Sequence, residues 1–81
     1  SIFVRDNFTC KECGVVGMYI EPHHIIPLKV NMELAYQITN GITLCRTCHK
    51  RTMGKEDLFK NKYLNMNEQE VGLFHFQLQV L

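Results

Sequence analysis

The sequence contains no tryptophan and no long run of apolar residues. No stretch approaches the roughly 18 to 20 consecutive apolar residues that a membrane-spanning helix needs. The first residues, Ser1–Asp6, lack the basic head and apolar run of a secretory signal, and no initiator methionine precedes them. These absences argue against a membrane or secreted protein. We therefore expect a cytoplasmic protein, and a fragment of a longer chain.

The chain is short for a domain with a self-sufficient core. Its 81 residues fit one domain, and its hydrophobic fraction of 46% is ordinary for a folded protein. A domain of this size often needs a disulfide or a bound metal to hold its core together. Four cysteines are the candidates for such a staple. We expect a single domain over residues 1–81.

The charged residues are unevenly placed along the chain. The net charge is +1, yet residues 43–62 carry six basic residues against two acidic ones. On a helix, residues four apart lie on one face. The basic residues with this spacing are Arg46, Lys50, Arg51 and Lys55. They could contact backbone phosphates, although a charged run is also typical of a merely solvated face.

The four cysteines form two Cys-x-x-Cys pairs. Cys10 and Cys13 make the first pair, and Cys45 and Cys48 follow after 31 intervening residues. Each pair places two sulfurs on one small loop, and two such loops complete the tetrahedral shell of zinc. A shell of four thiolates leaves no open position for water or substrate. The spacing therefore predicts a structural Zn²⁺, not a catalytic one.

Two other interpretations of the cysteines are weaker. Disulfides need an oxidising compartment, to which nothing in the sequence points. A thioredoxin-like redox motif uses one Cys-x-x-Cys pair, whereas this chain has two. A small redox or metal-storage protein would need thiols that are not all held in one closed shell.

Three histidines lie next to or between the cysteine pairs. His23 and His24 are adjacent, and Pro22 and Pro27 flank them. Adjacent residues of a regular strand point to opposite faces, so one shared site would require the strand to end or bulge here. His49 directly follows Cys48. If both lie in the first turn of a helix, they project about 100° apart, so Cys48 can face the zinc while His49 faces elsewhere.

Local patterns predict the remaining elements. Residues 15–26 are rich in β-branched and aromatic residues, with Gly17 as a hairpin turn, and residues 42–44 form a second short strand. Helix-forming composition begins at His49, and a second helix is expected over residues 56–64. Residues 74–80 alternate apolar and polar side chains, which favours a half-buried strand.

Three motifs together resemble the HNH endonuclease family. They are Arg5–Gly14 (RDNFTCKECG), His23–Leu28 (HHIIPL) and Asn40–His49 (NGITLCRTCH), and the resemblance covers about residues 3–55. It implies a small α+β fold, the ββα-metal motif, in which two short strands and a helix surround one divalent cation. Residues 56–81 would then form a C-terminal helix and strand added to this HNH motif.

The resemblance also implies roles for individual residues. His23 and His49 match the positions that bind a catalytic Mg²⁺, Mn²⁺ or other divalent cation. His24 matches the general base that activates water, and Asn40 the residue that orients the loop and the base. Some relatives supply a further ligand where this chain has Met53, a poor ligand for a hard cation.

The predicted activity is hydrolysis of DNA phosphodiester bonds. A histidine ordinarily has a pKa of about 6.5, so it can accept a proton near neutral pH, and a divalent cation can stabilise the phosphate and the leaving oxygen. We expect double-stranded DNA as the partner, little sequence preference, a fused or separate targeting protein, and a bacterial or phage origin. The alternative is a zinc-stabilised module that binds nucleic acid without cutting it.

Overall fold

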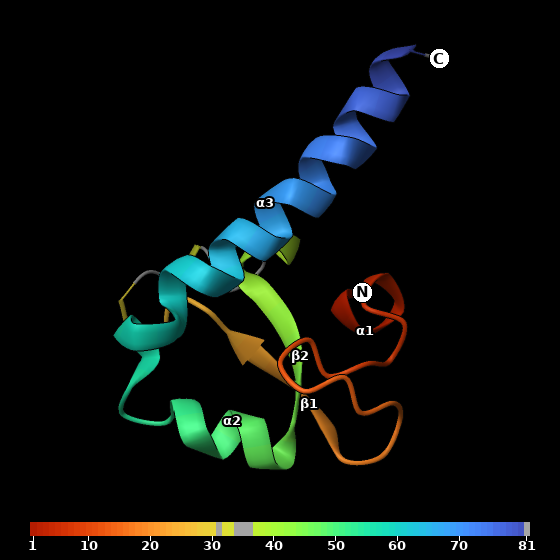
Figure 1. Ribbon diagram of the computed structural model, residues 1–81. Helices are drawn as coiled ribbons and strands as arrows, with labels where there is room; N and C mark the ends of the chain where they lie inside the picture. The colour runs from red at the N-terminus through yellow and green to blue at the C-terminus, as the bar shows by residue number, and fades with distance from the viewer. Residues whose placement is uncertain (31, 34–36, 81) are drawn as a thin grey trace.

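The computed structural model describes residues 1–30, 32–33 and 37–80, with side chains described through residue 68. The described part holds a two-stranded sheet, three α-helices and a short 3₁₀ helix (Figure 1). In chain order the elements are α1 (Ile2–Arg5), β1 (Ile20–His24), η2 (Ile38–Asn40), β2 (Gly41–Cys45), α2 (Arg46–Thr52) and α3 (Glu56–Val80).

The sheet consists of β1 and β2 paired antiparallel, and the register of this pairing accommodates Pro22 within β1. Ile20 lies opposite Cys45, and His24 lies opposite Gly41. Pro22 lies opposite Thr43. The N–H and carbonyl of Thr43 point away from β1 and bond to the N-terminal segment instead. At such a non-hydrogen-bonded position neither residue donates to its partner. The missing N–H of Pro22 therefore costs the sheet no hydrogen bond.

The second edge of β2 is covered by the N-terminal segment. The Thr43 N–H donates to Asp6 Oδ2 at 3.0 Å, and the Thr43 carbonyl accepts from the Lys11 N–H at 2.9 Å. With β1 on one edge and this segment on the other, β2 has partners along both sides. All five of its residues are buried. The strand β2 (Gly41–Cys45) is therefore the central, fully buried element of the domain.

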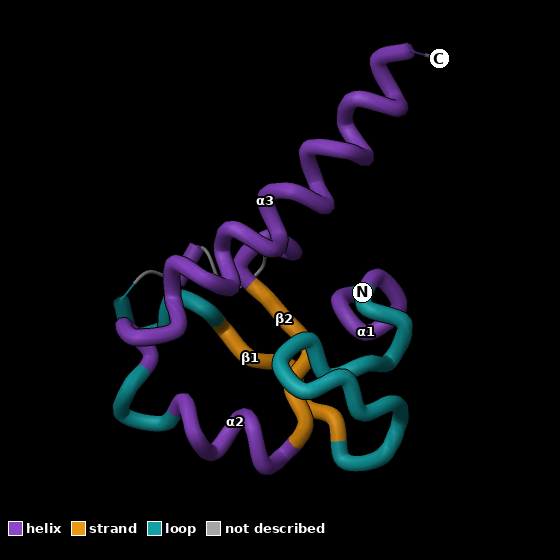
Figure 2. The backbone as a smooth tube through the Cα atoms, viewed as in Figure 1, coloured by secondary structure: helices purple, strands orange, loops and turns teal. Residues whose placement is uncertain are grey.

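The core is formed by buried side chains of β2, α2 and α3 together with Cys10 and Ile25, and Figure 2 shows these helices and strands side by side. Helix α2 continues directly from β2, so the Cys45 side chain caps it and the second cysteine pair spans the strand–helix junction. Tyr63 of α3 is fully buried and stacks on Phe59, with ring centroids 5.7 Å apart. The buried apolar residues are Cys10, Ile25, Ile42, Leu44, Cys45, Cys48 and Tyr63.

The expected strands are only partly correct. The strand expected within residues 15–26 is shorter, Ile20–His24, and Val16 makes only an isolated bridge to Thr9. Gly17 lies in a turn with a φ of 90°, as a hairpin glycine would. Tyr19 also has a positive φ, 58°, immediately before β1. The turn therefore ends just before β1, and regular pairing is confined to the second half of residues 15–26.

The strand predicted over residues 74–80 is wrong, because α3 continues as one helix from Glu56 to Val80. A helix that has begun adds one internal hydrogen bond per residue, whereas a strand needs a neighbouring strand. The alternating apolar residues 74, 76, 78 and 80 are also i, i+4 pairs, which suits a helix equally. In Figure 1 the C-terminal half of α3 extends away from the sheet. Of the described residues, no helical stretch has both the length and the apolar character to cross a membrane.

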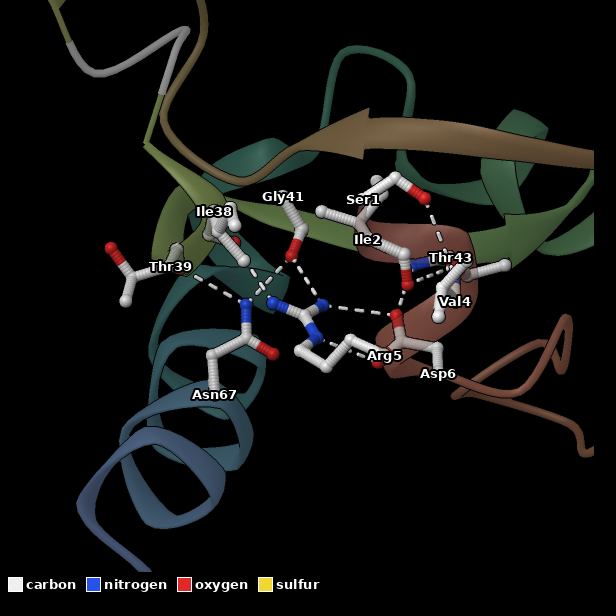
Figure 3. Close-up of polar contacts among 10 residues, drawn as sticks. All are labelled: Ser1, Ile2, Val4, Arg5, Asp6, Ile38, Thr39, Gly41, Thr43 and Asn67. Carbon is white, nitrogen blue, oxygen red and sulfur yellow. Dashed lines mark hydrogen bonds and ion pairs between the residues drawn. The ribbon is translucent and has the colours of Figure 1, made fainter. Parts of the chain in front are cut away.

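An ion pair between the half-buried Arg5 and the buried Asp6 lies where α1 meets the sheet (Figure 3). Two nitrogens of the Arg5 guanidinium each donate to one carboxylate oxygen of Asp6 at 2.9 Å, and two donate to the carbonyls of Ile38 and Gly41. Burial raises the pKa of Asp6, but the hydrogen bonds from Arg5 and Thr43 outweigh burial and leave the pKa below its ordinary value. Asp6 is therefore ionised at neutral pH.

Replacing this carboxylate should destabilise the whole domain. We expect Asp6→Asn to lower the free energy of unfolding by about 3 kcal/mol at neutral pH, because Arg5 loses its buried counter-charge. Urea unfolding of the zinc-loaded protein measures the change. Because the pKa of Asp6 is lowered in the folded state, its contribution is complete at neutral pH and is lost only as the pH falls below about 4. The exposed Asp57→Asn is the control, and an equal loss in both variants would contradict the prediction.

Candidate metal centre and histidine site

The four cysteine sulfurs meet at one point between the N-terminal segment and the start of α2. All four lie within 4.8 Å of one another, and Cys13 Sγ is 3.8 Å from Cys45 Sγ. The two pairs share one local geometry. The backbone N–H of the second cysteine donates to the sulfur of the first at 3.5 Å, in Cys10–Cys13 and again in Cys45–Cys48. The predicted cluster of four thiols is confirmed.

The ionisation of these thiols suits a bound cation. Burial raises the pKa of Cys10, but backbone N–H groups that donate to its sulfur, Cys13 first, outweigh burial and lower the pKa to about 6. Burial and the neighbouring sulfurs raise the pKa of Cys48. The protein thus favours one thiolate but opposes several at once. A divalent cation would remove this repulsion, and four sulfurs at this spacing fit zinc.

His23 is a buried imidazole with an unused nitrogen. Only 4% of its surface is exposed, and its Nε2 has no hydrogen-bond partner among the described residues. Its ring lies edge-on to the ring of His49, with centroids 5.2 Å apart, and edge-on to Tyr63 at 5.8 Å. Burial, and then the neighbouring His49, lowers the pKa of His23 to about 4. A neutral imidazole of this kind has a lone pair free to bind a metal.

Helix α2 directs Cys48 and His49 to different sites. Cys48 is buried in the thiol cluster, whereas His49, the next residue, lies beside His23. The predicted divergence of these two side chains is confirmed. His49 Nδ1 lies 2.7 Å from Glu21 Oε1. The hydrogen bond with His49 lowers the pKa of Glu21, so a carboxylate and not a carboxylic acid faces the imidazole.

His24 and Asn40 lie where β1 ends. His24 is the last residue of β1 and is exposed, so the strand ends at this histidine, as one site shared with His23 requires. Asn40 is 3% exposed, and its amide pairs with the backbone of Ile26, accepting from N–H at 2.8 Å and donating to the carbonyl at 3.1 Å. The Asn40 carbonyl also accepts from the Ile25 N–H at 2.8 Å. Asn40 therefore fixes the two residues after His24.

The long helix α3 in turn holds the segment that carries Asn40 (Figure 3). The buried Asn67 amide donates to the carbonyls of Thr39 at 3.0 Å and Gly41 at 2.7 Å. Arg5 donates to the Gly41 carbonyl from the other side at 2.8 Å. Sequence analysis missed Asn67, because an asparagine within a helix-forming stretch gives no sign of a buried partner 26 residues away.

The basic residues of α2 and the following turn differ in their surroundings. Arg46 Nε lies 3.5 Å from Glu21 Oε2, and its guanidinium lies over the Tyr19 ring, 5.2 Å from the centroid. Lys50, Arg51 and Lys55 are exposed, and α2 and the turn after it place them on the surface. The predicted contact of all four basic residues with DNA stays a prediction.

Two residues beside the histidines also escaped the sequence analysis. Glu21 and His23 are two apart on β1, so strand periodicity places them on one face and could have revealed Glu21. Tyr63 comes from α3, and nothing local in the sequence connects it to His23. Met53, at the position where some HNH proteins have another ligand, is 61% exposed and ends α2.

The fold and the cysteine cluster define a class of protein: a small α+β domain in which two antiparallel strands and a helix meet beside four cysteines that could hold a metal. The model of the HNH endonuclease family matches residues 10–53, just over half of the chain. The chain therefore belongs to the HNH endonuclease family, whose fold is the ββα-metal motif and whose domains cleave or bind nucleic acid. No curated protein and no solved structure matches the chain.

Removing zinc should unfold the domain. Structural zinc contributes about 10 kcal/mol in small domains, which is comparable to the total stability of such a chain. In the zinc-loaded protein all four thiols should resist a thiol reagent under native conditions, and all four should react after a strong chelator is added. Circular dichroism should show the loss of helix at the same time. Near-native ellipticity after complete removal of zinc would contradict the prediction.

Proposed function

We propose that this HNH domain is a metal-dependent endonuclease that hydrolyses phosphodiester bonds of double-stranded DNA. The observation that carries the proposal is the pair of imidazoles that meet where α2 packs beside β1. His23 is buried with a free Nε2, and the ring of His49 lies 5.2 Å from its own. A buried nitrogen without a partner is costly unless something binds it. His23 and His49 would hold a divalent cation, Mg²⁺ or Mn²⁺.

When bound, this cation would supply Lewis-acid stabilisation of charge on the phosphate and on the leaving oxygen. The chain's own residues perform the proton transfer. His24 accepts a proton from a water molecule, whose oxygen forms the new bond to phosphorus while the bond to the leaving oxygen breaks. His24 is exposed at the end of its strand, where a DNA backbone can approach it. The reaction needs no covalent intermediate with the protein.

Asn40 acts by positioning and not by touching the substrate. Its amide bonds both backbone groups of Ile26, and its carbonyl bonds the N–H of Ile25. The backbone that follows His24 is therefore fixed, which supports a defined position for the base. Arg5 and Asn67 hold the carbonyls on either side of Asn40, so α1 and α3 support the same loop.

DNA binding would rest on basic side chains near the histidines. These exposed residues lie on or just after α2, the helix that carries His49: Arg46, Lys50, Arg51 and Lys55. Contacts to phosphates provide affinity without reading sequence. A targeting protein, fused or separate, would then select the cleavage site. We also propose that residues 3–55 form the nuclease motif and residues 56–81 its C-terminal extension within one domain.

Replacing the proposed base should abolish cleavage and spare the metals. With Mg²⁺ or Mn²⁺, the zinc-loaded protein should nick or linearise supercoiled plasmid, and omitting the added cation should prevent it while the protein stays zinc-loaded. His24→Ala should lose at least about 100-fold in rate, the usual contribution of a general base. Its zinc content and its Mn²⁺ affinity should stay unchanged. His49→Ala is the matched comparison, because it should weaken Mn²⁺ binding as well as cleavage.

Two results would count against this mechanism. Near-normal cleavage by His24→Ala would show that another group is the base. No cleavage by folded, zinc-loaded wild-type protein with any cation, together with DNA binding, would indicate a binding module instead of a nuclease.

A basic residue on α2 should contribute to DNA affinity through phosphate contact. Lys50→Ala should weaken binding of a short duplex and reduce the slope of log affinity against log salt by about 0.9, as the loss of one phosphate contact requires. Lys60→Ala, on α3, is the control and should leave the slope unchanged. Fluorescence anisotropy across a salt series measures both variants. Equal slopes for Lys50→Ala and the wild type would place DNA on another face.

A further inference from the structure

The carboxylate of Glu21 lies between two side chains of α2. One oxygen, Oε1, is 2.7 Å from His49 Nδ1, and the other, Oε2, is 3.5 Å from Arg46 Nε. Arg46 in turn lies over the Tyr19 ring. Both ends of the carboxylate are thus engaged by α2, while Glu21 itself is fixed in β1 by the pairing of Glu21 with Leu44.

We propose that Glu21 is a positioning residue that sets the tautomer and ring orientation of His49. This proposal rests on the proposed function, in which His49 and His23 bind one divalent cation. A carboxylate can only accept a hydrogen bond, so the short contact requires the proton of His49 to lie on Nδ1. The Nε2 of His49 is then left with its lone pair, as a metal ligand must be. Without Glu21, either nitrogen could carry the proton.

The arrangement of the sheet explains how one strand serves both histidines. Glu21 and His23 are two residues apart in β1, so both face α2. The strand therefore supplies one candidate ligand directly, His23, and orients the other, His49, through Glu21. Arg46 forms an ion pair with the second oxygen of Glu21, which keeps that carboxylate turned toward α2. A carboxylate behind a metal-binding imidazole typically improves metal affinity 10- to 100-fold.

The tautomer of His49 can be read without any activity measurement. Nitrogen-15 correlation spectra of the zinc-loaded chain, recorded above the ordinary pKa of histidine and without a second cation, distinguish a protonated Nδ1 from a protonated Nε2. The wild type should show His49 with its proton on Nδ1. Glu21→Ala should move the proton toward Nε2, the position that a free imidazole side chain prefers. Glu21→Gln keeps an oxygen acceptor and should largely retain the wild-type tautomer.

Mn²⁺ affinity, followed by the electron paramagnetic resonance of free Mn²⁺, provides the second readout. We expect a loss of about 10- to 100-fold for Glu21→Ala, and a smaller loss for Glu21→Gln. The control is Glu68→Gln, an exposed carboxylate on α3, which should leave both readouts unchanged. Zinc content and thermal unfolding show whether each variant is folded, and Glu21→Gln replaces Glu21→Ala as the test if the latter does not fold.

Each outcome decides the role of Glu21. A shifted tautomer together with weakened Mn²⁺ binding supports it. An unchanged tautomer in folded Glu21→Ala, or Mn²⁺ affinity within twofold of the wild type, overturns it. Failure of the proposed function looks different: wild-type protein would not cleave DNA, yet it would still bind Mn²⁺ more tightly than Glu21→Ala does.

Discussion

The meeting of four cysteine sulfurs is the constraint on which the rest of this domain depends. Two loops that are 31 residues apart in the sequence bring these sulfurs within 4.8 Å of one another. One loop belongs to the N-terminal segment, and the other is the junction of β2 and α2. Because so small a chain buries few apolar side chains, a metal held by the four thiols would supply much of the stability. The meeting of the four sulfurs also fixes the direction in which α2 leaves the sheet.

The direction in which α2 leaves the sheet places His49 beside His23. Cys48 points into the thiol cluster, and the helical step to the next residue turns His49 toward His23 on β1. The thiol cluster and the histidine site therefore share one helix but use different faces of it. Glu21 and Arg46 add a second link between β1 and α2 beside the histidines. Rigid elements on both sides, and not loops, carry the imidazoles, which suits the metal site proposed for them.

The loop before β2 is held from three directions. Asn40 bonds the chain after His24, Arg5 reaches the loop from α1, and Asn67 reaches it from α3. The helix α3 begins beyond the residues that the family model matches, yet it contributes Asn67 and the buried Tyr63 beside His23. The C-terminal extension is thus part of the scaffold of the site and not an appendage, at least as far as its described side chains reach.

The sequence by itself determined the features that depend on spacing. Two Cys-x-x-Cys pairs indicate one four-thiol site because each short loop can place two sulfurs together, and the three motifs indicated the ββα-metal fold that the family match supports. The helical step predicted that Cys48 and His49 diverge. Only the tertiary structure decided which distant groups meet: Glu21 with His49, Tyr63 with His23, and Asn67 with the loop before β2. It also decided the helix over residues 74–80, where an alternating pattern favoured a strand. A local pattern records which conformations a segment can adopt, whereas the choice between them depends on whether a partner strand or a continuing helix satisfies the backbone.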